Sequence, residues 1–68
     1  MTIVLNGKSR EFAAPRFESV DDLLKELNLA GHPVLIELNG KALLKQEISQ
    51  YEINEGDHVE IVRMVAGG

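Results

Sequence analysis

The sequence of 68 residues contains no cysteine and no tryptophan. The absence of cysteine excludes a disulfide scaffold, a thiolate metal site and a cysteine nucleophile. Because small secreted domains usually depend on disulfides, we expect a cytoplasmic protein in a reducing compartment. The only aromatic residues are Phe12, Phe17 and Tyr51, so the predicted core is aliphatic.

Long apolar runs and basic residues are also scarce. No segment approaches the ~20 apolar residues of a membrane-spanning helix, and Met1 to Leu5 resembles a strand rather than a secretion signal. The formal net charge is −4. Since lysine and arginine supply the affinity for nucleic acids and anionic lipids, we expect neither nucleic acid nor membrane as a partner. An acidic surface suits a protein partner with a basic face, or serves solubility alone.

The length supports one domain. We interpret residues 1–68 as a single domain with a flexible tail at about 65–68, a monomer when alone. A chain this short buries only ~60% of the surface exposed by its unfolded form, which leaves little room for an enclosed active site. The sequence also contains no phosphate-binding glycine loop and no nucleophile–base pattern. We therefore expect no enzyme activity and no bound cofactor.

Turn signals divide the chain into strands. Asn6-Gly7 and Asn39-Gly40 predict tight hairpin turns, because both central turn positions need a positive φ. Apolar residues that alternate with polar ones predict strands on both sides of these turns, and a loop with one helical turn is expected at Gln46 to Asn54. The predicted strands cover about residues 1–5, 8–13, 34–38, 41–45 and 58–65.

One helix is predicted between the two hairpins. Ser19 is a candidate N-cap, and Asp21 and Asp22 follow in the first turn, where they favour the helix dipole. Gly31 can cap the other end, so we predict about three turns, from about Ser19 to Leu29. The apolar face of this helix consists of Val20, Leu23, Leu24 and Leu27.

These elements predict an α+β fold. A single amphipathic helix can bury its apolar face only against a sheet. If this helix forms the crossover connection, the first and last strands can pair in parallel. We therefore predict a ubiquitin-like β-grasp: a mixed sheet of four to five strands with one main helix packed on one face.

Other candidate site residues have simpler explanations. His32 precedes a proline at the helix exit and His58 lies near a turn, so two separated histidines predict no metal site. The carboxylates of Asp21 and Asp22 could suggest acid–base chemistry, but at a helix start they favour the dipole.

The end of the sequence is Ala66-Gly67-Gly68. Two terminal glycines arise by chance in only about 0.5% of chains, although a frayed end without function has the same appearance. A Gly-Gly end is thin and can thread a narrow channel in a partner enzyme. It would present the Gly68 carboxylate to a catalytic centre, with Gly67 and Ala66 as the threading segment. Adenylation by ATP would give this carboxylate a leaving group that a sulfur nucleophile can displace.

The sequence resembles the ThiS family of sulfur carriers, which act in thiamin thiazole synthesis. The resemblance spans nearly the whole chain. It rests on the order of the matching pieces, which are Ile3, Asn6-Gly7, Val20 to Leu24, Val34 to Gly40, Gly56-Asp57, Val59 to Ile61 and Val65 to Gly68.

The resemblance implies a cycle of activation and sulfur transfer. A ThiF-like enzyme adenylates the carboxylate of Gly68, and a cysteine desulfurase persulfide converts it to a thiocarboxylate. A ThiG-like thiazole synthase then takes the sulfur. The chain is thus a protein co-substrate, and ATP is used by the partner. Related carriers such as MoaD serve molybdopterin synthesis, and others serve tRNA thiolation or cysteine synthesis. A ubiquitin-like binding module without tail chemistry is the remaining alternative.

Two features bear on partner choice. ThiS proteins often carry Val-Pro-Arg after the central turn, whereas this sequence has Leu43-Leu44-Lys45. Alternation in the last strand places Val62 and Met64 on the sheet face away from the helix. We expect these two residues to form an exposed apolar patch for partner docking with Leu44, Leu35 or Val4, unless they are ordinary scattered surface residues.

Overall fold

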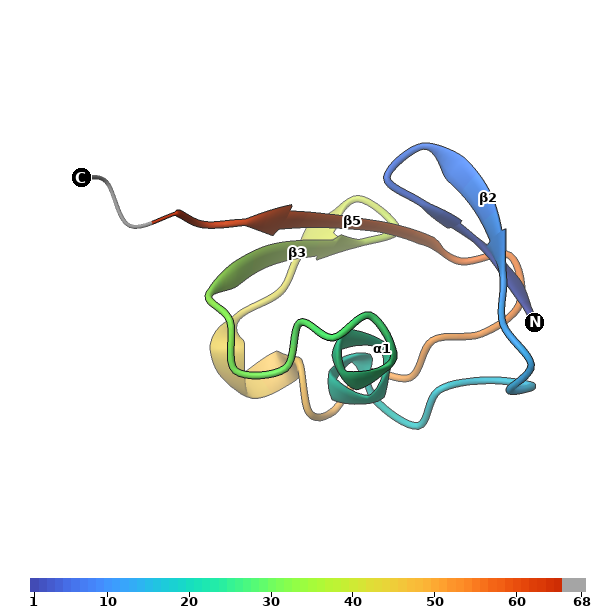
Figure 1. The fold of residues 1–68 in the computed structure, drawn as a ribbon, viewed down its shortest axis with the longest axis horizontal. Coiled ribbons are helices and arrows are strands. Elements are labelled where there is room, and N and C mark those ends of the chain that lie inside the picture. Colours follow the sequence, from blue (N-terminus) through green and yellow to red (C-terminus); the bar gives the residue numbers. More distant parts are fainter. Residues whose placement is uncertain (66–68) are drawn as a thin grey trace.

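A computed structural model describes residues 1–65 of the chain. Its elements are five strands, one α-helix and one short 3-10 helix, and the sheet order is β2-β1-β5-β3-β4 (Figure 1). Helix α1 lies across one face of the sheet, and no helix of residues 1–65 covers the other face. The predicted α+β architecture, a mixed sheet with one main helix on one face, is confirmed.

The first hairpin forms as predicted. Strands β1 (Thr2–Leu5) and β2 (Lys8–Glu11) pair antiparallel through a turn in which Asn6 has φ 51° and Gly7 has φ 81°. Strand β2 ends at Glu11 and does not continue to residue 13. The next side chain, Phe12, is buried and packs edge to face on Phe17, with ring centroids 5.3 Å apart.

The helix begins as predicted but ends early. Ser19 is the N-cap of α1 (Val20–Glu26), and its hydroxyl oxygen accepts the Asp22 backbone N–H at 3.4 Å. The prediction of three turns to Leu29 with Gly31 as the cap was wrong. Asn28 adopts a positive φ of 59°, which stops the helix three residues before that glycine.

The second half of the chain supplies three strands. β3 (Val34–Leu38) and β4 (Lys41–Ala42) form the second hairpin, and β5 (His58–Arg63) pairs parallel with β1 and antiparallel with β3. β4 is shorter than predicted: the Leu43 N–H still donates to the Ile36 carbonyl of β3 at 2.9 Å, and the Leu44 N–H turns to the side chain of Glu47 instead. β5 ends at Arg63 and not at residue 65. The loop after β4 contains the expected helical turn, a 3-10 helix at Lys45–Glu47.

The core lies between α1 and the sheet. Alternate residues of β1, β3 and β5 face the helix, and Phe17 and Ile53 close one end through two reciprocal backbone hydrogen bonds of 2.9 and 3.0 Å. The predicted aliphatic core is confirmed, with two phenylalanines added. The buried residues are Ile3, Leu5, Phe12, Phe17, Val20, Leu23, Leu24, Ile36, Leu38, Ile53, Val59 and Ile61.

Candidate functional site

The central strand β5 leads directly to the predicted tail. Beyond Arg63, the Met64 backbone N–H donates to the carbonyl of Pro33 at 2.9 Å, so the chain stays beside the start of β3. Figure 1 shows β5 running toward the side of the molecule opposite the N-terminus. Ala66, Gly67 and Gly68 lie outside the described residues, so their predicted roles remain predictions.

Large apolar side chains are exposed around the end of β5. Leu35 and Val62 lie directly opposite each other on β3 and β5, with exposed fractions of 60% and 58%. Leu44 is also 60% exposed and Met64 48%. We call Leu35, Leu44, Val62 and Met64 the apolar surface. The prediction that these residues are exposed is confirmed, and their docking role stays a prediction. Val4, the other candidate, is only half-exposed.

A groove of about 810 Å³ begins beside this surface. It lies between α1, the start of β3 and the segment after β4. Leu35, Leu44 and Met64 contribute to its lining, so three of the four residues of the apolar surface share one depression. Lys45 lines the same groove, at the place where the family pattern has arginine. This groove therefore joins the apolar surface to the segment that departs from the family pattern.

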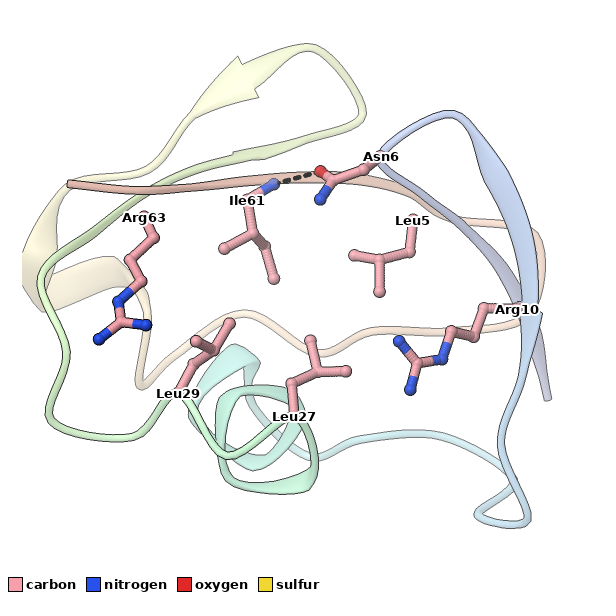
Figure 2. A pocket seen from close by; sticks show the side chains of 7 residues that line it. All are labelled: Leu5, Asn6, Arg10, Leu27, Leu29, Ile61 and Arg63. Atoms are coloured by element: carbon pink, nitrogen blue, oxygen red, sulfur yellow. Dashed lines mark hydrogen bonds between the residues drawn. The ribbon is translucent and has the colours of Figure 1, made fainter. Parts of the chain in front are cut away.

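A second, smaller cavity of about 240 Å³ lies between the end of the helix and the sheet (Figure 2). Leu5, Leu27, Leu29 and Ile61 supply its apolar lining, and Arg10 and Arg63 stand on opposite sides. Both guanidinium groups already have neighbours. Arg63 lies 3.1 Å from His32 Nδ1, and Arg10 stacks 5.5 Å from the centroid of the Phe12 ring. The cavity is smaller than the usual 300–1,000 Å³ of small-molecule sites, so it does not favour an active site.

The two histidines are held by different partners. His32 contacts Arg63, whereas the His58 backbone N–H donates to Asn39 Oδ1 at 2.8 Å. Within residues 1–65, no three histidine, aspartate or glutamate side chains cluster as metal ligands. Asp21 and Asp22 both lie in the first turn of α1, as predicted for residues that favour the dipole.

A polar cluster missed by the sequence analysis borders the groove. Glu47 Oε1 accepts the Leu44 backbone N–H at 2.8 Å, and Glu47 Oε2 lies 3.3 Å from Lys41 Nζ. Lys41 Nζ donates in turn to the Tyr51 hydroxyl oxygen at 2.6 Å. The Leu44 hydrogen bond is the main cause that lowers the pKa of Glu47, and the Tyr51 hydrogen bond is the main cause that raises the pKa of Lys41. Both groups are therefore charged at neutral pH.

The only sequence signal for this cluster is a glutamate three residues after the start of a helical turn. That spacing is half of a capping box, in which Ser or Thr normally precedes the turn. Leu44 occupies the position of that Ser or Thr, so the capping box cannot be recognised from the sequence.

Helices of the described chain are too short and polar to cross a membrane.

Comparisons with known proteins agree on one family. The sequence profile of the ThiS family matches residues 3–68. A crystal structure of the thiamine biosynthesis protein ThiS from Geobacter metallireducens superposes with a TM-score of 0.84 and 31% identity, covering 100% of both chains. An NMR solution structure of a thiamine biosynthesis protein from the same organism gives a TM-score of 0.82 at 31% identity, covering all of this chain and 88% of the other.

A curated relative extends the comparison to a larger protein. The chain is 37% identical over all 68 residues to part of a thiazole synthase from Paramagnetospirillum magneticum, strain ATCC 700264 / AMB-1. It spans 20% of the length of that relative. The similarity is therefore to one segment of a much longer polypeptide.

Proposed function

Because the chain belongs to the ThiS family, we propose that it is a sulfur carrier of thiamin biosynthesis and that the Gly68 carboxylate holds the sulfur. The observation that carries this proposal is the family match over residues 3–68, together with the whole-chain similarity to a solved ThiS structure. In this function the chain is a co-substrate, which is consumed and regenerated while its partners catalyse the reactions.

The proposed chemistry begins with activation of the terminal carboxylate. An oxygen of the Gly68 carboxylate attacks the α-phosphorus of ATP, pyrophosphate leaves, and a mixed anhydride with AMP forms. A carboxylate is a poor acyl donor, and the AMP leaving group removes that obstacle. A ThiF-like enzyme supplies the ATP site, since this sequence has no phosphate-binding loop.

Sulfur enters in the second step. The terminal sulfur of a persulfide, formed by a cysteine desulfurase or another donor, attacks the activated carbonyl carbon and AMP leaves. A thiol then reduces the resulting S–S bond and releases the thiocarboxylate of Gly68. These steps need ATP and a thiol reductant, and both requirements fit our proposal of a cytoplasmic location.

The last step transfers sulfur to a ThiG-like thiazole synthase. The similarity of this whole chain to a fifth of a protein named thiazole synthase supports that partner. The fold also supports delivery of the tail, because β5 is paired on both sides and leads directly to it. The proposed threading segment, Ala66 and Gly67, is narrow enough for an enclosed channel.

We further propose that the activating enzyme docks on the apolar surface. Leu35, Leu44, Val62 and Met64 are exposed beside the end of β5, so a protein bound there would sit next to the tail. A docked partner would cover side chains that are costly to leave in water.

Intact-mass spectrometry tests the proposal. The purified chain is incubated with a ThiF-like enzyme, ATP and a persulfide donor. We expect a mass gain equal to the replacement of one oxygen by one sulfur. Deletion of Gly68, or addition of one residue after it, should abolish the gain while the circular dichroism spectrum stays unchanged. An unchanged mass with an enzyme that modifies another ThiS protein would refute the proposed function.

A further inference from the structure

One carboxylate holds the segment that follows β4. Glu47 Oε1 accepts the Leu44 backbone N–H at 2.8 Å, while Glu47 Oε2 lies 3.3 Å from Lys41 Nζ and accepts the Tyr51 hydroxyl at 3.4 Å. Lys41 also lies over the Tyr51 ring, 4.8 Å from its centroid. Glu47 therefore connects Lys41 of β4, Leu44 at the start of the 3-10 helix, and Tyr51, which follows that helix.

Two hydrogen bonds hold the backbone of Leu44, and the Glu47 side chain makes one of them. The residue has φ −76° and ψ 160°, the polyproline II conformation. Its carbonyl oxygen accepts the Glu47 backbone N–H at 2.9 Å, whereas its own N–H donates to the Glu47 carboxylate. Leu44 precedes the 3-10 helix as its N-cap, yet its side chain has no oxygen that could cap the helix. Among the described residues, its N–H donates a hydrogen bond to the Glu47 carboxylate.

The contact lies beside the apolar surface. The Leu44 side chain is 60% exposed and lines the groove together with Leu35 and Met64. The Glu47 side chain is only 21% exposed, although its bond to the Leu44 N–H lies at the surface. Hydrogen bonds to an ionised acceptor are roughly twice as strong as neutral ones.

We infer that Glu47 is a positioning residue for partner recognition, because it holds Leu44 in the backbone conformation that places its side chain in the apolar surface. This inference rests on the proposed function, since it assumes that an activating enzyme docks on that surface. In this role Glu47 acts through Leu44 and takes no part in the chemical step.

The size of the expected effect follows from conformational entropy. If Leu44 were free to sample several backbone conformations, the partner would have to order it on binding. Fixing the backbone of one residue lowers a binding constant roughly 5- to 30-fold. Loss of Glu47 should therefore weaken recognition by about that factor and leave the chemical step unchanged.

A proline at position 44 tests whether Glu47 acts through the Leu44 N–H. Proline fixes φ near −65°, close to the value at Leu44, and has no N–H. In a Leu44→Pro background the constraint no longer depends on Glu47. If Glu47 acts through the Leu44 N–H, Glu47→Ala should have a large effect in the natural chain and almost none in the proline background.

The measurement is ATP–pyrophosphate exchange by a ThiF-like enzyme, with the carrier as the varied substrate. We expect Glu47→Ala to raise KM roughly 5- to 30-fold with kcat unchanged, and Leu44→Pro/Glu47→Ala to differ less than about twofold from Leu44→Pro. Glu52→Ala is the matched control, since Glu52 is an exposed glutamate whose ion pair with Arg16 is only a 4.0 Å contact. Glu47→Gln keeps an oxygen acceptor and should stay close to the natural chain.

Amide exchange gives an independent readout. The Leu44 N–H should exchange faster in Glu47→Ala, while the N–H of Ile53, which donates to the Phe17 carbonyl at 3.0 Å, stays protected. Lost protection at Ile53 would mean that the variant is unfolded. Glu47→Met, which keeps a side chain of similar length without the carboxylate, would then replace it in the kinetic comparison.

The outcomes separate the two proposals. An unchanged KM in folded Glu47→Ala, or the same rise in both backgrounds, would overturn the positioning role alone. Absence of exchange with the natural chain would overturn the proposed function and with it this inference.

Discussion

The side-chain oxygen of Asn6 accepts a hydrogen bond from the backbone N–H of Ile61 at 2.8 Å. Asn39 makes the equivalent contact in the second hairpin turn, where its side-chain oxygen accepts the His58 N–H, also at 2.8 Å. Both turns therefore hold β5, the strand that leads to the tail. Each asparagine has two roles, since it adopts the positive φ of the turn and also satisfies a backbone donor of the central strand.

Substitution of Asn6 separates these roles. Asn6→Asp keeps an oxygen acceptor and should change little. Asn6→Gly tolerates φ 51° but leaves the Ile61 N–H without its acceptor, so we expect a loss of about 1 kcal/mol in unfolding free energy. Asn6→Ala adds the cost of a left-handed backbone and should lose about 1 kcal/mol more. Urea unfolding checks this order, and equal stability of the glycine and aspartate variants would contradict it.

Two glutamates face each other on the bare side of the sheet. Glu37 on β3 lies directly opposite Glu60 on β5, two register positions from the Leu35–Val62 pair. Like charges at opposed positions destabilise a sheet. Glu37→Lys should raise the unfolding free energy by roughly 0.5–1 kcal/mol, and Glu37→Gln by about half as much. Thermal or urea unfolding at low and high salt measures the effect, which should shrink with salt; an unchanged midpoint at low salt would argue against repulsion.

A charge in the apolar surface should weaken docking. Val62→Lys should raise the carrier KM of the activating enzyme about tenfold, with kcat and folding stability little changed, because the partner must bury a charged group. Ser9→Lys is the control. It adds the same charge on β2, which β1 separates from β5. A similar rise in KM for both variants would indicate a general effect of charge and not contact at Val62.

The pKa shift of Glu47 predicts a pH dependence of stability. The Leu44 hydrogen bond lowers the pKa of Glu47 in the folded chain, whereas the unfolded value is about 4.3. The ionised form is thus favoured by folding. This contribution is complete above the unfolded pKa and is lost as the pH falls through the lowered one.

We therefore expect Glu47→Gln to reduce the loss of stability on acidification from neutral pH to below the lowered pKa, as measured by urea unfolding. On the basic side, the raised pKa of Lys41 gives a contribution that is complete below about pH 10.4 and is lost as the pH rises through the raised value. Parallel stability curves for the natural chain and the glutamine variant would disprove the acid-side effect.

Local rules predict much of this fold. The two Asn-Gly turns were recognisable because they require positive φ at adjacent residues, and Ser19 was recognisable as a cap by its hydroxyl group. The end of the helix could not be recognised from the sequence. Asn28 tolerates a left-handed φ nearly as well as glycine does, and the sequence gives no reason to prefer it over Gly31.

The site required contacts that the sequence does not reveal. Exposure of Val62 and Met64 followed from alternation in one strand. Glu47, by contrast, meets Lys41 and Tyr51 only after the chain folds back. The departure at Leu43-Leu44-Lys45 is also easier to understand in the structure. The φ of Leu44, −76°, is one that proline would accept, so leucine with a hydrogen-bonded N–H keeps a proline-like conformation there.

The position of β5 between β1 and β3 has a mechanical consequence. A partner that draws the tail into a channel pulls on Val65 along the direction of the strand. Backbone hydrogen bonds on both edges of β5 lie across that direction, so the load is shared by many bonds at once instead of breaking them one after another. A pull on this end should therefore leave the folded domain intact, as repeated use of one copy in the proposed function requires.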